Sequence, residues 1–288
     1  MLQLDSPCKV NLVLNILGRR PDGFHELETV MQPVPLCDQI QIDSATAGLR
    51  LTCSDPNLPV DGTNLVYRAA MSFLAAARLD AGLSIHLKKR IPMAAGLGGG
   101  SGNAATTLIG LNEFFQRPLS SHQLQELAAD LGSDVPFFLQ SQPAIATGRG
   151  ERVESVPSFP ALSGTGLLLI HPGFGISTPW AYQQLSRFPE ALNGRPGRAR
   201  EVVDLLCAGK LEVAATQFYN SLEAPALEKY PILALYQEFL REQGALGALM
   251  SGSGSTTFAL VENIRSGRVL EQRFLSKFGP CWTSVVSL

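Results

Sequence analysis

The chain has 288 residues, of which 45% are hydrophobic and 17% charged, a balance that suits one large or two moderate folded domains and excludes a disordered chain. Its formal net charge is −2, and no block of lysine or arginine occurs. A general nucleic-acid binder or a membrane-surface protein would need a basic face, so neither is expected.

The first segments of the chain predict strands. Residues 9–17 alternate apolar and polar side chains with the two-residue period of a strand. The apolar positions of this segment are Val10, Leu12, Leu14 and Ile16. Three further segments are predicted from their composition, namely a polar turn over 19–23 and strands over 27–34 and 38–43.

A helix should follow a loop over residues 55–62 that contains two prolines. Thr63 is expected to cap this helix, which should span residues 64–79. Its predicted inner face consists of Leu65, Ala69, Phe73 and Ala76. A strand over 84–90 comes next, and its alternation predicts that Ile85 and Leu87 face the core.

Five glycines gather within residues 92–106, between this strand and a helical run over 104–115. Glycine lets a ligand approach the backbone closely, and the first turn of a helix has N–H groups without intrahelical partners. Together with the helix dipole, these features predict a phosphate site. The alternative is a flexible linker, against which Leu97 and the flanking strand and helix argue. The segment has no Walker A lysine, and it lacks the Gly-x-Gly-x-x-Gly spacing of Rossmann folds and protein kinases.

The second half of the chain mixes helices and strands unevenly, which predicts an α+β fold. Ser120 and Gln123 are spaced as a capping box for a helix that should end at Gly132. Residues 147–166 are rich in glycine, serine and proline, so we place a domain boundary there and expect domains 1–155 and 156–288. The remaining predicted elements are a buried strand over 167–170, a mobile loop over 188–200, helices over 201–207, 211–221 and 231–243, a second glycine loop over 251–255 and a strand over 256–261.

Lys9 and Asp134 are candidates for chemistry, because a kinase needs a positioned hydroxyl group and balanced charge. From the pattern alone, each also fits a structural role, Lys9 as a solubilising residue at a strand edge and Asp134 as a turn residue. His25 likewise fits a structural role. No His-Glu-x-x-His or Gly-x-Ser-x-Gly motif occurs, so a zinc protease or a serine hydrolase is not expected.

The five cysteines are scattered, and no Cys-x-x-Cys pair occurs. Neither a zinc site nor a disulfide framework is therefore expected, and a reducing cytoplasm fits best. The first residues have no basic stretch leading into an apolar one, so no signal peptide is expected. No run reaches the ~18 apolar residues of a membrane span.

Several segments together resemble the GHMP kinases, the superfamily of galactokinase, homoserine kinase and mevalonate kinase. The segments that carry the resemblance are the glycine-rich residues 92–106, Pro7-Cys8-Lys9-Val10-Asn11, Arg20-Pro21-Asp22-Gly23-Phe24-His25-Glu26-Leu27 and Leu131-Gly132-Ser133-Asp134-Val135-Pro136-Phe137. Three later segments fall in the family's order, namely His171-Pro172-Gly173 with Ser177-Thr178-Pro179, Asn220-Ser221-Leu222-Glu223, and the loop over 251–255. The match spans nearly the whole chain and is closest to the branch that phosphorylates a cytidine-diphosphate derivative of methylerythritol.

The resemblance implies a two-domain fold with an N-terminal domain of the ribosomal-protein-S5-like type and a ferredoxin-like C-terminal domain. The active site is expected in the cleft between them, and the last strand is expected to pack back on the N-terminal domain. The implied reaction transfers the γ-phosphate of ATP, with Mg²⁺, to the 2-hydroxyl of the substrate in non-mevalonate isoprenoid synthesis.

The resemblance also implies roles for individual residues. Lys9 and Asp134 become the catalytic pair, and Ser101 reaches phosphate or Mg²⁺. The implied ATP-binding residues are Asn64, Lys89, Pro92, Met93, Ala94, Ala95, Gly96, Leu97, Gly98, Gly99, Gly100, Ser101, Gly102 and Asn103. The implied substrate-binding residues are Asn11, Phe24, His25, Thr178 and Tyr182. Three residues depart from the family's usual pattern: Phe24 replaces tyrosine, Cys8 replaces alanine and Gly102 replaces serine.

Two alternatives stay open. One is another small-molecule GHMP kinase, acting on homoserine or a mevalonate derivative, which would not need the aromatic and histidine pair Phe24 and His25. The other is a catalytically silent nucleotide-binding protein on the same fold, against which the presence of both Lys9 and Asp134 argues. The expected partner is a small molecule, with neither nucleic acid nor membrane, and the expected state is a monomer or weak homodimer.

Overall fold

The computed structural model describes the whole chain, residues 1–288. The chain forms two compact units that interleave along the sequence. Unit 1 consists of Met1–Cys8, Leu36–Pro92 and Gly98–Ser141, and unit 2 consists of Lys9–Pro35, Met93–Leu97 and Gln142–Leu288. These units divide the chain differently from the predicted boundary at residue 155, because the long strands β1 (Leu2–Arg19) and β2 (His25–Ala45) each contribute residues to both units.

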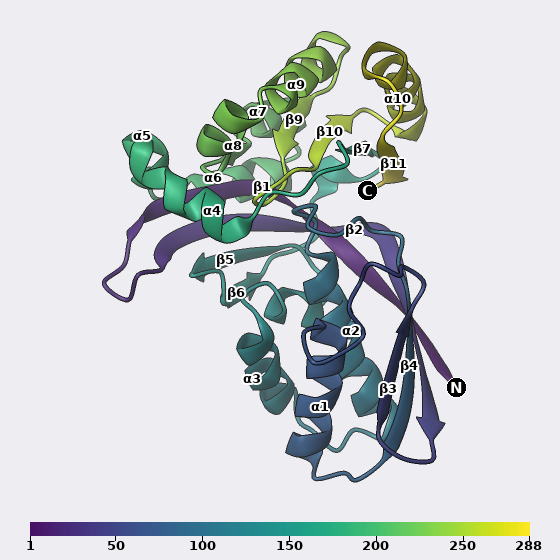
Figure 1. Cartoon of the computed structure of the whole chain (residues 1–288). Helices are drawn as coiled ribbons and strands as arrows, with labels where there is room; N and C mark the ends of the chain where they lie inside the picture. Colours follow the sequence, from purple (N-terminus) through teal and green to yellow (C-terminus); the bar gives the residue numbers. More distant parts are fainter. The chain divides into compact units, whose positions relative to one another are not determined.

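Unit 1 combines a strand group with a helical layer (Figure 1). Strand β4 pairs antiparallel with the second half of β2 and parallel with β3. Helices α1, α2 and α3 and the short 3₁₀ helix η1 pack on one another. The bounds are β3 (Leu49–Cys53), α1 (Leu65–Ala77), β4 (Gly82–Lys88), α2 (Gly99–Phe114), α3 (Ser121–Leu131) and η1 (Pro136–Leu139). The inward positions of β4 are confirmed, since Ile85 and Leu87 are buried.

The strands predicted over 27–34 and 38–43 are a single strand, β2. The predicted cap of α1 is also wrong. Asn64, and not Thr63, occupies the N-cap, where its Oδ1 accepts a hydrogen bond of 2.8 Å from the N–H of Val66. Thr63 donates instead to Asp61. By contrast, the capping box of α3 between Ser120 and Gln123 is present as predicted.

Helix α2 begins at Gly99, five residues before its predicted start, so its glycines lie inside the helix. Close packing explains why a helix tolerates them. A Cβ atom on Gly102 would lie 2.5 Å from the carbonyl oxygen of Pro7, and one on Gly110 would lie 2.4 Å from Leu4 Cδ1. The absence of side chains at these positions lets α2 lie directly on the N-terminal segment of β1, and this contact outweighs the poor helix propensity of glycine.

Unit 2 contains the other halves of β1 and β2, and a separate four-stranded sheet in the order β11-β7-β10-β9. The first part of β2 pairs with β5, β5 pairs with β6, and β1 pairs parallel with β8. Helices α9 and α10 pack on the four-stranded sheet and on each other (Figure 1). The strand bounds are β5 (Ala144–Gly148), β6 (Arg152–Ser155), β7 (Gly166–His171), β8 (Tyr219–Asn220), β9 (Gly247–Met250), β10 (Thr257–Val261) and β11 (Trp282–Ser287).

One prediction for this part of the chain is corrected and another stays open. The last strand, β11, pairs with β7 along its whole length and so completes the sheet of unit 2, while its packing on the N-terminal domain stays a prediction. Residues 188–200 are not a loop, because α5 and the start of α6 occupy most of them. The helix bounds are η2 (Pro160–Leu162), α4 (Thr178–Gln184), η3 (Leu185–Arg187), α5 (Pro189–Leu192), α6 (Arg198–Cys207), α7 (Leu211–Thr216), α8 (Glu223–Lys229), α9 (Ile232–Glu242) and α10 (Ile264–Phe278). None of the helices has the length and apolar character that crossing a bilayer requires.

Candidate active site

Lys9 lies on β1 in unit 2 and is buried. Its Nζ donates hydrogen bonds to Asn11 Oδ1 at 2.5 Å and to the carbonyl oxygen of Gly96 at 3.4 Å. Its backbone N–H donates to the carbonyl oxygen of Leu97 at 3.0 Å. The predicted catalytic lysine is therefore attached both to a predicted substrate residue and to the first part of the glycine loop.

The orientation of Asn11 is fixed by Thr29, a buried residue of β2 that sequence reasoning missed. The Asn11 Nδ2 group donates to Thr29 Oγ1 at 2.8 Å, and the Thr29 hydroxyl donates to the carbonyl oxygen of Val13 at 2.5 Å. These bonds leave Asn11 Oδ1 directed at Lys9. Thr29 follows the Phe24-His25 motif by only a few residues, but nothing in its sequence context distinguishes it from an ordinary strand residue.

The two glycine loops of the sequence meet within unit 2. Ser251 Oγ donates to the carbonyl oxygen of Gly96 at 2.9 Å, and the N–H of Thr256 donates to the carbonyl oxygen of Ala95 at 3.1 Å. Gly96 has a φ of +75°, and a Cβ atom on it would lie 2.0 Å from the carbonyl oxygen of Ser251. The loop over 251–255 therefore holds the segment Met93–Leu97 in place through these hydrogen bonds.

We expect Gly96→Ala to destabilise the protein far more than Gly209→Ala. Gly209 has a nearly equal φ of +73°, but a Cβ atom on it would meet no other atom within 4 Å, so it isolates the cost of the backbone conformation. That cost is about 1–2 kcal/mol. Displacing the Ser251 carbonyl should add about 1–3 kcal/mol in Gly96→Ala. Urea unfolding of both variants measures the difference, and equal losses would contradict the close contact.

The start of α2 in unit 1 provides backbone donors for an anion. The N-cap is Gly98, with a φ of +68° and no side-chain capping bond. The N–H of Gly102 donates to the carbonyl oxygen of Gly98 at 2.8 Å. The N–H groups of residues 99–101 precede that bond, so they have no intrahelical acceptor and lie at the positive end of the helix dipole. The hydroxyl of Ser101 belongs to the same turn.

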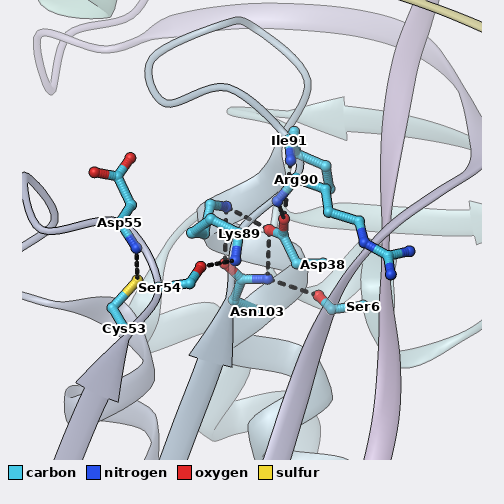
Figure 2. A network of polar contacts seen from close by, with 9 residues as sticks. All are labelled: Ser6, Asp38, Cys53, Ser54, Asp55, Lys89, Arg90, Ile91 and Asn103. Carbon is cyan, nitrogen blue, oxygen red and sulfur yellow. Dashed lines mark hydrogen bonds and ion pairs between the residues drawn. The ribbon is translucent and has the colours of Figure 1, made fainter.

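Asp38 organises the surroundings of this helix start and was also missed by sequence reasoning (Figure 2). It is fully buried, and its Oδ1 accepts hydrogen bonds from the N–H groups of Arg90 at 2.7 Å and Ile91 at 2.9 Å. Its Oδ2 accepts from Asn103 Nδ2 at 3.0 Å and forms an ion pair with Lys89 Nζ. One carboxylate thus links β2, the end of β4 and the first turns of α2.

This network changes the interpretation of two predicted ATP-binding residues. Lys89 Nζ also donates to Asn103 Oδ1 at 3.3 Å, and Asn103 Nδ2 donates to Ser6 Oγ at 2.9 Å (Figure 2). The charge of Lys89 is compensated by Asp38, and the amide of Asn103 is engaged at both ends. In the structure these side chains hold the flanks of the glycine loop in place.

Asp134 lies in unit 1, half-buried, in the turn between α3 and η1. Its neighbour η1 packs on α2, and a Cβ atom on Gly102 would lie 3.5 Å from Phe138 Cε1. The segment that carries Asp134 is therefore attached to α2 within one unit. Lys9 belongs to the other unit, and its pairing with Asp134 stays a prediction.

Of the predicted substrate residues, His25 at the start of β2 and Tyr182 on α4 lie next to each other. The rings of His25 and Tyr182 lie 5.1 Å apart between centroids, tilted by 38°. Phe24 is 53% exposed. Burial, assisted by the charge of Arg19, lowers the pKa of His25 below its ordinary value. A neutral imidazole has one donor and one acceptor nitrogen, which suits recognition of the edge of a base.

Two other predicted residues have structural partners. Thr178 Oγ1 and Ser253 Oγ lie 2.7 Å apart, so Thr178 contacts the second glycine loop. Asn64 caps α1 and donates from Nδ2 to the carbonyl oxygen of Pro59 at 2.6 Å. A role for Asn64 in nucleotide binding would need to coexist with this cap.

Glu223 anchors the strand that leads into the second glycine loop. Its Oε1 accepts hydrogen bonds from the N–H of Met250 at 2.7 Å and from Gln237 Nε2 at 2.5 Å. Burial raises the pKa of Glu223 to about 7, although these donors oppose the shift.

We expect Glu223 to make the stability fall as the pH rises from about 4.5 to about 7. Within this window the folded protein binds more protons than the unfolded chain, so the free energy of unfolding should fall by about 3 kcal/mol. Glu223→Gln should remove this contribution and stabilise the protein at pH 8. Urea unfolding between pH 5 and 8 measures both slopes, with Glu212→Gln on the exposed face of α7 as the control. An unchanged slope in Glu223→Gln would contradict the expectation.

Comparisons with known proteins agree with this arrangement. The family model of the GHMP kinase N-terminal domain matches residues 64–142, and that of the C-terminal domain matches residues 202–279. A 4-diphosphocytidyl-2-C-methyl-D-erythritol kinase from Pelotomaculum thermopropionicum is 44% identical over 93% of this chain and 91% of its own length. One of the same name from Geobacter sulfurreducens is 38% identical over 94% of this chain and 95% of its own.

Solved structures give the same result. A 4-(cytidine 5'-diphospho)-2C-methyl-D-erythritol kinase superposes with a TM-score of 0.80 at 33% identity, covering all of both chains. The homoserine kinase of Cytophaga hutchinsonii has a TM-score of 0.77 at 19% identity over all of this chain and 94% of its own, which shows a shared fold alone. The chain has the two-domain GHMP kinase fold, and it belongs to the GHMP kinases, in the same family as the curated 4-diphosphocytidyl-2-C-methyl-D-erythritol kinases.

Proposed function

We propose that this protein is an ATP-dependent kinase that phosphorylates the 2-hydroxyl of 4-diphosphocytidyl-2-C-methyl-D-erythritol. The products are the 2-phosphate and ADP, as part of non-mevalonate isopentenyl diphosphate synthesis. The observation that carries the proposal is the 38–44% identity to kinases of this name over more than nine-tenths of both chains. The glycine loop, Lys9 and Asp134 provide the chemistry that such a reaction requires.

The residues present fit ATP. The open N–H groups at the start of α2 can hold phosphate oxygens, and Gly98 and Gly99 leave room for close approach. No group of three or more His, Cys, Asp or Glu side chains forms a metal cage. This suits Mg²⁺, which usually takes most of its ligands from water and nucleotide phosphates, with Ser101 as the protein ligand we propose. When bound, the ion would neutralise charge on the transferring phosphate.

On the acceptor side we propose that Asp134 holds the substrate hydroxyl in line and accepts its proton. The buried ammonium of Lys9 would stabilise the alkoxide that develops as this proton leaves. Asn11, held by Thr29, keeps the ammonium in place. Positioning and electrostatic stabilisation supply most of the catalysis in phosphoryl transfer, so the rigid support of these groups is central to the mechanism.

A panel of substrates tests the proposal. ADP release from ATP should be observed with 4-diphosphocytidyl-2-C-methyl-D-erythritol and should be at least a hundredfold slower with homoserine or mevalonate. The latter are real competitors, because homoserine and mevalonate kinases share the fold at 16–19% identity. Turnover of only homoserine or mevalonate would refute the proposed substrate, and the absence of turnover with all three would favour a silent nucleotide-binding protein.

A further inference from the structure

The turn between β5 and β6 in unit 2 holds one arginine in a defined place. Arg149 lies between Gly148 and Gly150, which have φ values of +74° and +105°. Its backbone N–H donates to Glu151 Oε2 at 2.6 Å. A Cβ atom on Gly148 would lie 2.8 Å from the same carboxylate. The turn therefore closes tightly on the Glu151 carboxylate, and this geometry fixes where the Arg149 side chain begins.

The Arg149 guanidinium lies over the ring of Phe24, 4.7 Å from the ring centroid. The turn that carries Phe24 is also ordered, since the N–H of Arg20 donates to the carbonyl oxygen of Phe24 at 2.8 Å and the N–H of Phe24 donates to Asp22 Oδ1 at 3.1 Å. Arg20 forms ion pairs with both Asp22 and Glu26. The Arg149 guanidinium, in contrast, forms no direct ion pair, although its charge attracts the carboxylates of Asp22 and Glu151 on the turns beside it.

This arrangement leaves two binding features open. The guanidinium lies over the Phe24 ring, yet the residue is 53% exposed, so much of its surface stays open to a stacked base. The guanidinium keeps its N–H donors for an anion, and an arginine binds phosphate oxygens through two parallel hydrogen bonds. A pyrimidine ring joined to a diphosphate has both matching groups.

We propose that Arg149 is a substrate-binding residue, which supports the Phe24 ring and binds the diphosphate of the cytidine-diphosphate substrate. The inference rests on the proposed function, whose substrate contains this group. Arg149 contacts neither the glycine loops nor Lys9 and Asn11. The residue should therefore affect the affinity for the cytidine substrate and leave the chemical step and ATP binding unchanged.

Arg149→Met tests the proposal, since methionine keeps an unbranched apolar side chain and removes the charge. We expect the KM for 4-diphosphocytidyl-2-C-methyl-D-erythritol to rise about tenfold or more, as for the loss of a hydrogen bond to a charged group, with kcat and the KM for ATP within twofold of the wild type. Arg149→Lys should recover part of the loss. Arg152→Met is the matched control, because Arg152 lies on the same hairpin and is exposed.

Binding measurements separate this role from simple support of the ring. Calorimetry should show that Arg149→Met weakens the binding of CDP about tenfold and weakens the binding of cytidine, which depends on the support of the ring alone, much less. Equal losses for CDP and cytidine would overturn the phosphate contact, and unchanged affinity for CDP together with an unchanged KM would overturn the proposal altogether. If the wild type did not phosphorylate the substrate, the proposed function would fail, while the comparison of CDP with cytidine would still decide the role of Arg149. Equal melting temperatures establish that the variants are folded.

Discussion

Replacing Asp134 by asparagine is expected to lower kcat at least about a hundredfold while the protein stays folded, because a positioned base contributes about 10²–10⁴ in rate. Asparagine has nearly the same shape but cannot take up the proton of the substrate hydroxyl or carry the negative charge. Asp134 lies in the turn between α3 and η1, outside any helix or strand. The KM for ATP should change little, since the backbone donors of α2 remain.

Steady-state kinetics with saturating ATP measure this effect. Asp130→Asn is the matched control, because Asp130 is exposed on α3 a few residues earlier and should leave kcat unchanged. Full activity in Asp134→Asn would remove Asp134 from the mechanism. A loss accompanied by a lower melting temperature would instead indicate a structural role.

Lys9→Ala is expected to reduce kcat by a similar factor, at least about a hundredfold. Its buried ammonium is held by Asn11 and by the carbonyl oxygen of Gly96, and alanine leaves both of these acceptors without a donor. Lys9→Met separates charge from volume. It should lose as much activity as Lys9→Ala and retain more stability, whereas recovery of activity in Lys9→Met would show that the charge is not required.

The double variant Lys9→Met with Asp134→Asn tests whether the two residues act together. Groups that act as one unit give strongly non-additive losses, so the double variant should be hardly slower than either single variant. Additive losses would mean that the two residues contribute independently. Lys88→Met, on the exposed side of β4, is the control for removing a lysine.

Local pattern was sufficient for much of the fold. The alternation in β4, the apolar run of β7 and the capping box of α3 predicted those elements correctly, because each depends on residues that are close in sequence. The start of α2 was misplaced for the opposite reason. Its glycines have poor intrinsic helix propensity, and only the contact with Pro7, almost a hundred residues away in sequence, explains why a helix forms there.

The same distinction separates the site residues. Motifs identified Lys9 and the glycine loop, because each belongs to a short continuous stretch of the sequence. The structure brings the two stretches together. Asp38 and Thr29 could not be recognised, since their importance lies in hydrogen bonds to groups on other elements. Arg149 belongs to this second class, because the ring it covers is on a different turn.

The interleaving of the two units has a consequence for how the protein holds together. The chain passes between them after Cys8, Pro35, Pro92, Leu97 and Ser141, so no single cut yields one complete unit. Two of these passages border Lys9 and the start of α2. A fragment that ends near the predicted boundary would keep strands whose partners lie in the missing part, such as β1 without β8. Neither half of the chain is therefore expected to fold on its own. Unfolding of one unit would also unfold the strands that continue into the other unit, which favours a single cooperative transition.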